Sequence, residues 1–253
     1  MFKFVRLTAL LLLCGTGVNS APALAGSGLP AFGAPASAVG APSRLQVSYD
    51  VIKSGIKAAT ITETYTRTQD RYRIESVSRA VGIVALIKPE TITVVSEGRV
   101  TANGLRPHIF TNKRKLDSER NTSADFDWVS NRITLNDRNG KRVVPLPAGT
   151  QDRLSAMYQF MFAPLKNATA LDFYMTNGSK VDIYNYLVTP GSSVTVPLGT
   201  FHALYITNSP KANESRTEIW LATEHANFPC KMTITDPDGD KLTQVLTRFD
   251  ATP

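Results

Sequence analysis

Hydrophobic and polar residues alternate along most of this chain with a period of two. The alternation is clear in "LQVSYDV" at 45–51, "RYRIESVSR" at 71–79 and "TITVVSEGRV" at 91–100, which are rich in Thr, Val, Ile and Tyr. Such a period places successive side chains on opposite faces of a β-strand, and β-branched and aromatic residues suit a half-buried pleated surface. About a dozen segments of this kind predict an all-β, mainly antiparallel fold: a curved sheet forming a β-spiral, a roll or an open barrel.

Turn signals separate these segments. They are Asp-Arg-Asn-Gly at 137–140, Asn-Gly at 177–178, Pro-Gly at 190–191 and Asp-Gly at 238–239. Asn-Gly and Asp-Gly supply the positive backbone angles of tight hairpins, and Pro followed by Gly favours a turn. We therefore expect a turn at each of the four positions.

Two segments depart from the alternation. Residues 80–90, "AVGIVALIKPE", predict one short turn of helix that Pro89 stops. Residues 151–165, "QDRLSAMYQFMFAPL", predict a longer helix that Asp152 caps and Pro164 ends. Apolar residues surround nearly the whole circumference of this second helix, as in a buried helix. We expect it to lie inside the curved sheet.

The first 25 residues have the three parts of a secretory signal: a basic start, an apolar run and Ala-Leu-Ala before a cleavage point after Ala25. Lipid attachment at Cys14 is disfavoured because Leu13 stands where a lipobox requires a small residue. The Ala-, Gly-, Pro- and Ser-rich residues 26–43 predict a flexible linker, and residues 44–253 a single β-rich domain. We expect a periplasmic protein of a Gram-negative bacterium with no transmembrane span in its mature form.

Charge and composition narrow the class of partner. Removing the leader takes away Lys3 and Arg6 and lowers the formal charge from +7 to +5. The densest basic cluster, "NKRKLDSER" at 112–120, contains acids and is typical of a solvated strand edge. A nucleic-acid-binding surface needs a basic stripe with interleaved aromatic residues. The sequence predicts no nucleic-acid partner.

Candidate catalytic groups are few. Cys230 is the one cysteine beyond the leader, and the three histidines, His108, His202 and His225, are scattered. No nucleophile motif, metal-ligand spacing or dinucleotide fingerprint accompanies them. The aspartates at 236, 238 and 240 lack the Gly and Glu of a calcium loop, and their Pro-Asp-Gly favours a hairpin turn. We expect no enzyme activity, no cofactor and no metal, with Cys230 as a buried apolar residue.

Several motifs resemble those of one bacterial family. "LQVSYDVIKSGIKAA", "GLRP" at 104–107, "DRLSAMYQF" at 152–160 and the segment from "TEIWLA" to "FPCKMTITDPDGDKLTQVL" occur in this order. Together they resemble the family called domain of unknown function 3108 over roughly residues 45–249. Phe228 and Cys230 stand where Leu and Val are more usual. The resemblance implies an exported protein without an established reaction, similar in fold to periplasmic β-spirals and, more loosely, to the open barrels of lipoprotein carriers.

We therefore predict a non-enzymatic envelope protein that binds a lipid, lipoprotein or polypeptide in an apolar cleft beside the longer helix. The predicted lining residues are Leu154, Met157, Tyr158, Met161 and Phe162, since Met and aromatic side chains adapt to apolar ligands. One alternative is an assembly factor that contacts protein partners through sheet edges and the basic cluster. An envelope hydrolase would need His202, His225 and Cys230 or an acid to meet in a cleft.

Overall fold

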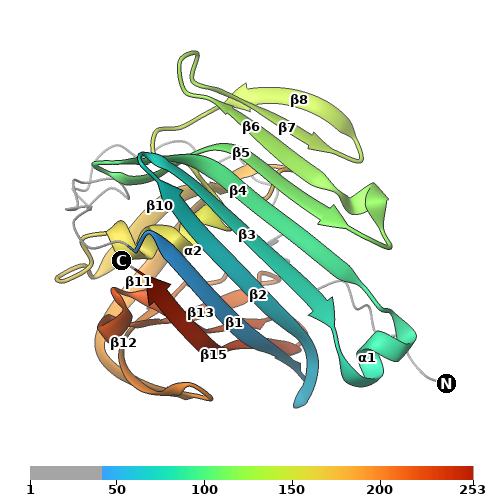
Figure 1. Cartoon of the computed structure of the whole chain (residues 1–253), viewed down its shortest axis with the longest axis vertical. Helices are drawn as coiled ribbons and strands as arrows, with labels where there is room; N and C mark the ends of the chain where they lie inside the picture. The colour runs from blue at the N-terminus through green and yellow to red at the C-terminus, as the bar shows by residue number, and fades with distance from the viewer. Residues whose placement is uncertain (1–41, 253) are drawn as a thin grey trace.

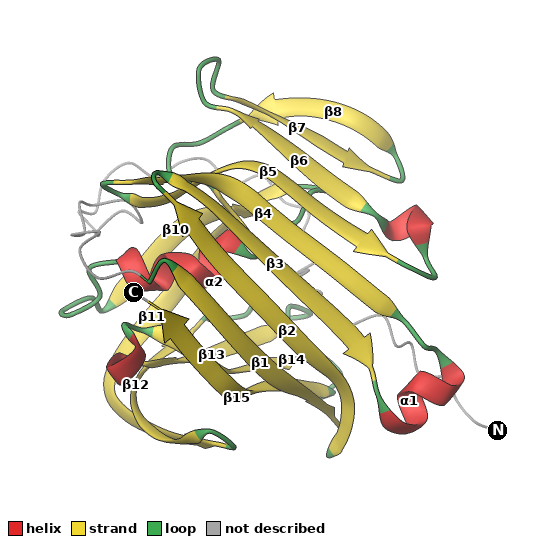
Figure 2. Cartoon of the chain, viewed as in Figure 1, coloured by secondary structure: helices red, strands yellow, loops and turns green. Residues whose placement is uncertain are grey.

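The computed structural model describes residues 42–252, which form one wide, curved sheet with short helical segments (Figures 1 and 2). The predicted leader, 1–25, and nearly all of the predicted linker, 26–43, lie outside the described residues. The 15 strands are β1 (Arg44–Lys53), β2 (Ile56–Thr68), β3 (Arg71–Ala80), β4 (Thr91–Thr101), β5 (Gly104–Arg114), β6 (Thr122–Asp127), β7 (Arg132–Asp137), β8 (Gly140–Pro145), β9 (Gln151–Asp152), β10 (Ala170–Thr176), β11 (Val181–Val196), β12 (Gly199–Thr207), β13 (Arg216–Ala222), β14 (Phe228–Thr235) and β15 (Lys241–Thr252).

The helical segments are short. They are α1 (Gly82–Ile87), α2 (Ser155–Gln159) and the 3-10 turns η2 (Ser118–Arg120), η3 (Phe160–Phe162) and η4 (Thr223–His225). The prediction of a mainly antiparallel, curved β-fold around one apolar helix is confirmed.

The first and last strands lie side by side at the centre of the sheet. The order is β8-β7-β6-β5-β4-β3-β2-β1-β15-β14-β13-β12-β11-β10-β9, so among the strands of residues 42–252 only β1 and β15 are neighbours that lie far apart in sequence. In this pair Arg44 lies opposite Thr252 and Lys53 opposite Leu242. Every neighbouring pair is antiparallel except β9 and β10, where Gln151 lies opposite Met175 in parallel. Two antiparallel halves therefore meet where the domain begins and ends.

The sheet curls until its β9–β10 end approaches β4, β5 and β6 (Figure 1). Side chains, rather than backbone ladders, bridge this gap in the described part of the chain. Ser96 Oγ donates to Asp152 Oδ2 over 2.5 Å, and Thr122 Oγ1 donates to the Asn177 carbonyl over 2.7 Å. Gln151 Nε2 donates to the Leu105 carbonyl over 2.9 Å. The result is a barrel-like sheet that stays open.

The longer helix is shorter than the predicted 151–165. Gln151 and Asp152 pair with β10 as strand β9, and α2 begins only at Ser155. Asp152 still caps the first turn, because its Oδ1 accepts the amide hydrogens of Leu154 and Ser155 at 2.9 and 2.8 Å. Helical structure ends at Phe162, and Ala163 is extended, as the residue before a proline prefers.

Segment α2–η3 separates two apolar cores, as its all-round apolar surface predicts. Leu154, Tyr158 and Phe162 belong to a core formed mostly by β1–β7. Ala156, Phe160 and Ala163 belong to a second core with β10–β13. The two halves of the curled sheet thus bury opposite faces of one short helix, with α2 inside the curl (Figure 1).

Gln159 fastens this helix to the start of β5. Its Oε1 accepts the Leu105 amide hydrogen at 2.7 Å, and its Nε2 donates to the Asn103 carbonyl at 2.8 Å. Gly104 has φ +92°, and a Cβ there would lie 2.4 Å from Gln159 Oε1. The Gly-Leu-Arg-Pro and helix motifs of the sequence are therefore in contact, and Gly104 is required both by its backbone angle and by this close approach.

Three of the four predicted turns are present. They connect β7 to β8, β10 to β11, and β14 to β15, and each contains a glycine with positive φ. The prediction for 190–191 is wrong: Pro190 and Gly191 lie within β11, where the register with β12 shifts between Thr189 and Ser192. A bulge tolerates the missing Pro amide hydrogen and the positive φ of Gly191, so the strand bends without reversing.

Candidate functional site

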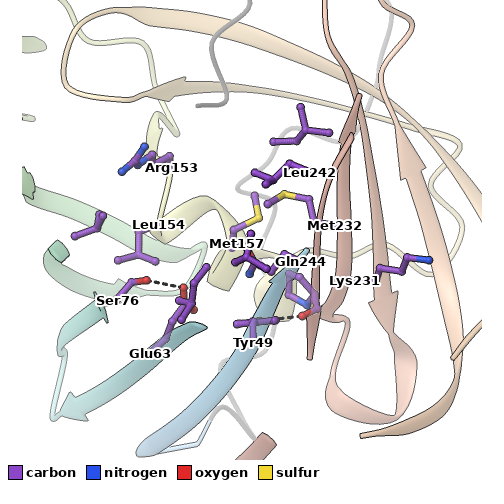
Figure 3. Close-up of a pocket in the computed structure, with 15 residues that line it drawn as sticks. Tyr49, Glu63, Ser76, Arg153, Leu154, Met157, Lys231, Met232, Leu242 and Gln244 are labelled. Atoms are coloured by element: carbon purple, nitrogen blue, oxygen red, sulfur yellow. Dashed lines mark hydrogen bonds between the residues drawn. The ribbon is translucent and has the colours of Figure 1, made fainter. Parts of the chain in front are cut away.

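An apolar pocket lies where α2 faces the strands at the centre of the sheet (Figure 3). Its volume is about 80 Å³. Strands β1–β4, β14 and β15 and the start of α2 line it, so both ends of the domain contribute. Its lining is mainly apolar and comprises Tyr49, Val51, Ile61, Glu63, Ser76, Val94, Arg153, Leu154, Met157, Pro229, Lys231, Met232, Ile234, Leu242 and Gln244.

Glu63 brings an acid into this apolar environment. It follows Ile61 and precedes Tyr65 on the inward face of β2, and its side chain is buried. Ser76 Oγ donates to Glu63 Oε1 over 2.9 Å, and Tyr158 Oη donates to Oε2 over 3.0 Å. Burial raises the pKa of Glu63 to about 7, against the lowering effect of these two hydrogen bonds.

Two tyrosines complete the polar part of the pocket region. Tyr49 Oη donates to the Pro229 carbonyl over 3.0 Å, which ties β1 to β14. Burial, and then the nearby Glu63, raise the pKa of Tyr49 and of Tyr158 far above the ordinary tyrosine value. Both phenols therefore stay neutral and act as hydrogen-bond donors.

The chemistry available in the pocket is proton and hydrogen-bond exchange at one carboxyl group. With a pKa of about 7, Glu63 is protonated in a large share of molecules near neutral pH, so it can donate as well as accept a hydrogen bond. Neither a histidine nor a cysteine lies among the residues that line the pocket.

The structure places the five predicted lining residues in three environments. Leu154 and Met157 line the pocket. Tyr158 is fully buried and reaches the pocket through its hydrogen bond to Glu63. Phe162 lies in the core and Met161 packs against that core, and neither lines the pocket. Ligand binding by these residues stays a prediction.

The strand residues of the pocket, above all Glu63, were not predicted from the sequence. A signal was present: Glu63 and Ser76 occupy positions in phase with the buried residues Ile61, Tyr65 and Ile74 of their strands. A polar residue in the inward phase of an alternating strand must be hydrogen-bonded inside the sheet. The alternation along each strand therefore identifies Glu63 and Ser76 as candidate buried polar residues, but it does not show that they line the same pocket.

Cys230 is a buried strand residue, as predicted. It is fully buried in the first core, and its Sγ lies 3.3 Å from the Trp220 carbonyl oxygen as a donor. Burial raises the pKa of its thiol to about 11, which keeps it protonated and unreactive.

Of the histidines that the hydrolase alternative names, His202 meets an acid and His225 meets an aromatic ring. His202 Nδ1 is 2.8 Å from Glu224 Oε1, and the imidazole of His225 stacks on Phe249 at a centroid distance of 4.1 Å. The contact between His202 and Glu224 supplies part of the arrangement that the hydrolase alternative requires, and the absence of enzyme activity stays a prediction.

The aspartates at 236–240 form the predicted hairpin turn. The Gly239 amide donates to the Asp236 carbonyl over 2.8 Å, and the Asp236 amide donates to the Asp240 carbonyl over 2.9 Å. Within residues 42–252, no three His, Cys, Asp or Glu side chains are grouped so as to hold a metal ion. No helix in the same range reaches the length and apolar character that a membrane crossing requires.

The chain is similar to solved structures of other proteins. The β-barrel-like protein of domain of unknown function DUF1849 from Brucella abortus is similar to 84% of this chain over 99% of its own, with 14% identity and a TM-score of 0.53. A protein with a YmcC-like fold from Bacteroides fragilis aligns with 87% of this chain and 99% of its own, at 7% identity and a TM-score of 0.35. The first likeness supports the barrel-like architecture. Comparison with curated proteins yields no match.

A family model matches most of the chain. The match spans residues 44–247, from the first residue of β1 into β15. It includes every strand that lines the apolar pocket and the Gly104–Gln159 contact. The chain therefore belongs to the family described as "Protein of unknown function (DUF3108)".

Proposed function

We propose that this protein is an exported, non-enzymatic protein of the cell envelope that binds the apolar part of a lipid, lipoprotein or polypeptide in the apolar pocket. The observation behind this proposal is the pocket itself, which lies inside the open barrel between α2 and the central strands. Flexible apolar side chains line it, among them Met157, Met232 and Leu242. The leader pattern of residues 1–25 supports export to the periplasm.

The size of the pocket limits what binds without rearrangement. Sites for drug-sized ligands measure roughly 300–1,000 Å³, whereas this pocket measures about 80 Å³. A longer apolar chain enters only if side chains move. Met157 and Met232 are suited to this because an unbranched thioether changes rotamer at low cost.

Met157→Trp tests this proposal. The larger ring fills the pocket and should abolish enhancement of fluorescence by N-phenyl-1-naphthylamine, a neutral apolar probe, and uptake of a fluorescent fatty acid. Met161→Trp is the matched control, because Met161 lies on the same helical segment, is also half-buried and does not line the pocket. Equal binding by both variants, or no uptake by the unaltered protein, refutes the proposal.

Protein purified from its own envelope gives a second, independent test. Native mass spectrometry should detect a co-purifying lipid or peptide whose mass leaves on denaturation. Determination of the mature N-terminus in the periplasmic fraction tests export, with cleavage after Ala25 as the expected result. A protein that stays in the cytoplasmic fraction contradicts the proposed location.

An assembly factor is the second candidate, and α1 favours it. None of the residues of α1 is buried, and Ile83, Leu86 and Ile87 are 60%, 86% and 81% exposed. Exposed apolar side chains grouped on one element are typical of a contact surface. A photo-crosslinker at Leu86 should capture one specific envelope protein if this function holds, whereas a crosslinker at the exposed Val129 should not.

A further inference from the structure

A second cavity, rich in arginine, lies where the β10–β11 turn meets the ends of β5, β6 and β7. Its volume is about 510 Å³. Six cationic side chains line it, namely Arg114, Arg120, Arg138, Arg142, Arg153 and Lys180, against two acids, Glu119 and Asp137. We call it the basic cavity. Its lining carries an excess of four positive charges, although the whole sequence has a formal charge of only +7.

Internal ion pairs neutralise only part of this charge. Asp137 binds Arg142 at 3.1 Å, and Asp117, which lies outside the lining, binds Arg120 at 3.2 Å. Lys180 lies 2.5 Å from Asp182, also outside the lining. Among residues 42–252, neither Arg114 nor Arg138 forms an ion pair with a carboxylate. These two guanidinium groups remain available to an anion.

Arg114 has an unmet hydrogen-bonding requirement. It is 9% exposed, and its Nε is buried without a hydrogen-bond partner in the described part of the chain. Its side chain points inward in phase with those of Phe110 and Asn112 on β5, while Lys113 and Lys115 face solvent. The nearest acids, Glu90 and Asp117, favour its charged form, but burial outweighs them and lowers the pKa of Arg114. The guanidinium stays charged, and a buried Nε donor left without a hydrogen bond is costly.

Arg153 connects the basic cavity to the apolar pocket. It belongs to the lining of both, and its guanidinium carbon lies 5.9 Å from the centroid of the Phe110 ring. Figure 3 shows Arg153 at the end of the apolar pocket away from Tyr49 and Glu63. A ligand with one anionic and one apolar end fits this arrangement, with its anionic end in the basic cavity and its apolar end in the apolar pocket on the other side of Arg153.

We propose that the basic cavity binds the phosphate group of an amphiphile whose apolar part occupies the apolar pocket. Phosphate is favoured because its several oxygens accept paired donors from planar guanidinium groups. The side-chain NH2 group of Asn121, whose Oδ1 accepts the Arg114 amide hydrogen, adds a neutral donor to the lining. The amphiphile part of this inference rests on the proposed function, whereas the anion site stands on Arg114 and Arg138.

Calorimetry with two probes tests the site: dihexanoyl phosphatidic acid and inorganic phosphate. Arg114→Gln and Arg138→Gln should each weaken binding of the lipid by about tenfold or more, as loss of a charge-assisted pair does. Lys113→Gln removes one charge from the adjacent, solvent-facing position of β5 and should change affinity by less than about twofold. Because Arg138 is exposed in the β7–β8 turn, its variant keeps the test valid even if Arg114→Gln destabilises the fold.

The two probes and a neutral one separate the outcomes. Tighter binding of the lipid than of inorganic phosphate, with loss in both arginine variants, supports the whole inference. Equal affinities assign the site to free phosphate and overturn its amphiphile part. Arginine variants that bind the lipid like the unaltered protein overturn the anion site, yet N-phenyl-1-naphthylamine binding would leave the proposed function standing. If the protein binds phosphate but does not take up this neutral probe, the anion site stands and the proposed function is overturned.

Discussion

The phenol of Tyr158 donates a hydrogen bond to the carboxyl group of Glu63 over 3.0 Å, joining α2 to β2 at residues 95 positions apart. Both side chains are almost completely buried. The contact holds the helix inside the sheet and places an ionisable group beside an apolar pocket. Under the proposed function, stability and ligand binding are therefore linked at this pair.

Stability should depend on pH through Glu63. Its pKa is about 7 in the folded protein and near 4.5 when unfolded. Between pH 4.5 and pH 7 the folded state therefore binds more protons than the unfolded state. The free energy of unfolding contributed by Glu63 is therefore highest below about pH 4.5 and falls as pH rises to about 7.

Glu63→Gln removes this titration. Relative to the unaltered protein, its free energy of unfolding should increase by about 2–3 kcal/mol between pH 5 and pH 8. Urea unfolding at several pH values measures the difference. Other groups also make stability depend on pH, because burial lowers the pKa values of His108 and His225 and raises that of Asp152. Both proteins contain these groups, so their contributions cancel in the difference. A difference that does not vary with pH contradicts the prediction.

Tyr158→Phe should destabilise the protein by about 1–3 kcal/mol, because the Glu63 carboxyl loses a buried donor. It should also raise the pKa of Glu63 further, since the hydrogen bond from Tyr158 lowers that pKa. Chemical denaturation measures the first effect, and NMR titration of the Glu63 carboxyl carbon the second. Tyr174→Phe is a suitable control, because Tyr174 is 37% exposed and its loss should have little effect.

Tyr65→Phe should have the opposite effect on stability from Tyr158→Phe. Tyr65 is fully buried and stacks on Tyr158, but its hydroxyl has no hydrogen-bond partner among the described residues. Removing an unsatisfied buried hydroxyl should leave stability unchanged or raise it by up to about 1 kcal/mol. In the neighbouring Tyr72, whose hydroxyl lies 3.1 Å from Ser96 Oγ, the same substitution should destabilise. Thermal unfolding of both variants provides the comparison.

Gln159→Leu should free α2 from the start of β5. The substitution leaves the Leu105 amide and the Asn103 carbonyl without their partner, at a cost of about 2–4 kcal/mol if both stay dry. Gly104→Ala should also destabilise, through positive φ and contact with Gln159. A double-mutant cycle with Gln159→Ala should show a smaller cost for Gly104→Ala, while strictly additive costs would exclude the contact.

Local patterns in the sequence were sufficient for the β-fold and for three of the four predicted turns. Alternation follows from the pleat of a strand, and Asn-Gly and Asp-Gly require backbone angles that tight turns use. The all-round apolar surface of 154–162 predicted a buried helix because no face of it can remain in water. The hairpin of β14 and β15 and the burial of Cys230 were predictable for the same reason. All these features depend on neighbours within a few residues.

Three features depend on contacts between segments distant in sequence. The Pro190-Gly191 bulge and the shorter α2 depend on pairing with β12 and β10, which no local signal encodes. Residues 112–120 were expected at a solvated edge, but Asn112 and Arg114 turn inward, because β5 continues to bury the face that carries Phe110.

What the sequence determined by itself was therefore the kind of element, strand, turn or helix, along most of the domain, since these follow from short-range sterics and amphipathicity. The tertiary structure alone decided which of these elements meet. Pairing of β1 with β15 and the curl of the sheet bring Glu63, Met157 and Met232 to one pocket, and Arg114, Arg138 and Arg153 to one cavity. Such sites depend on packing between distant segments, and the periodicity of a single strand contains no information about its distant neighbours.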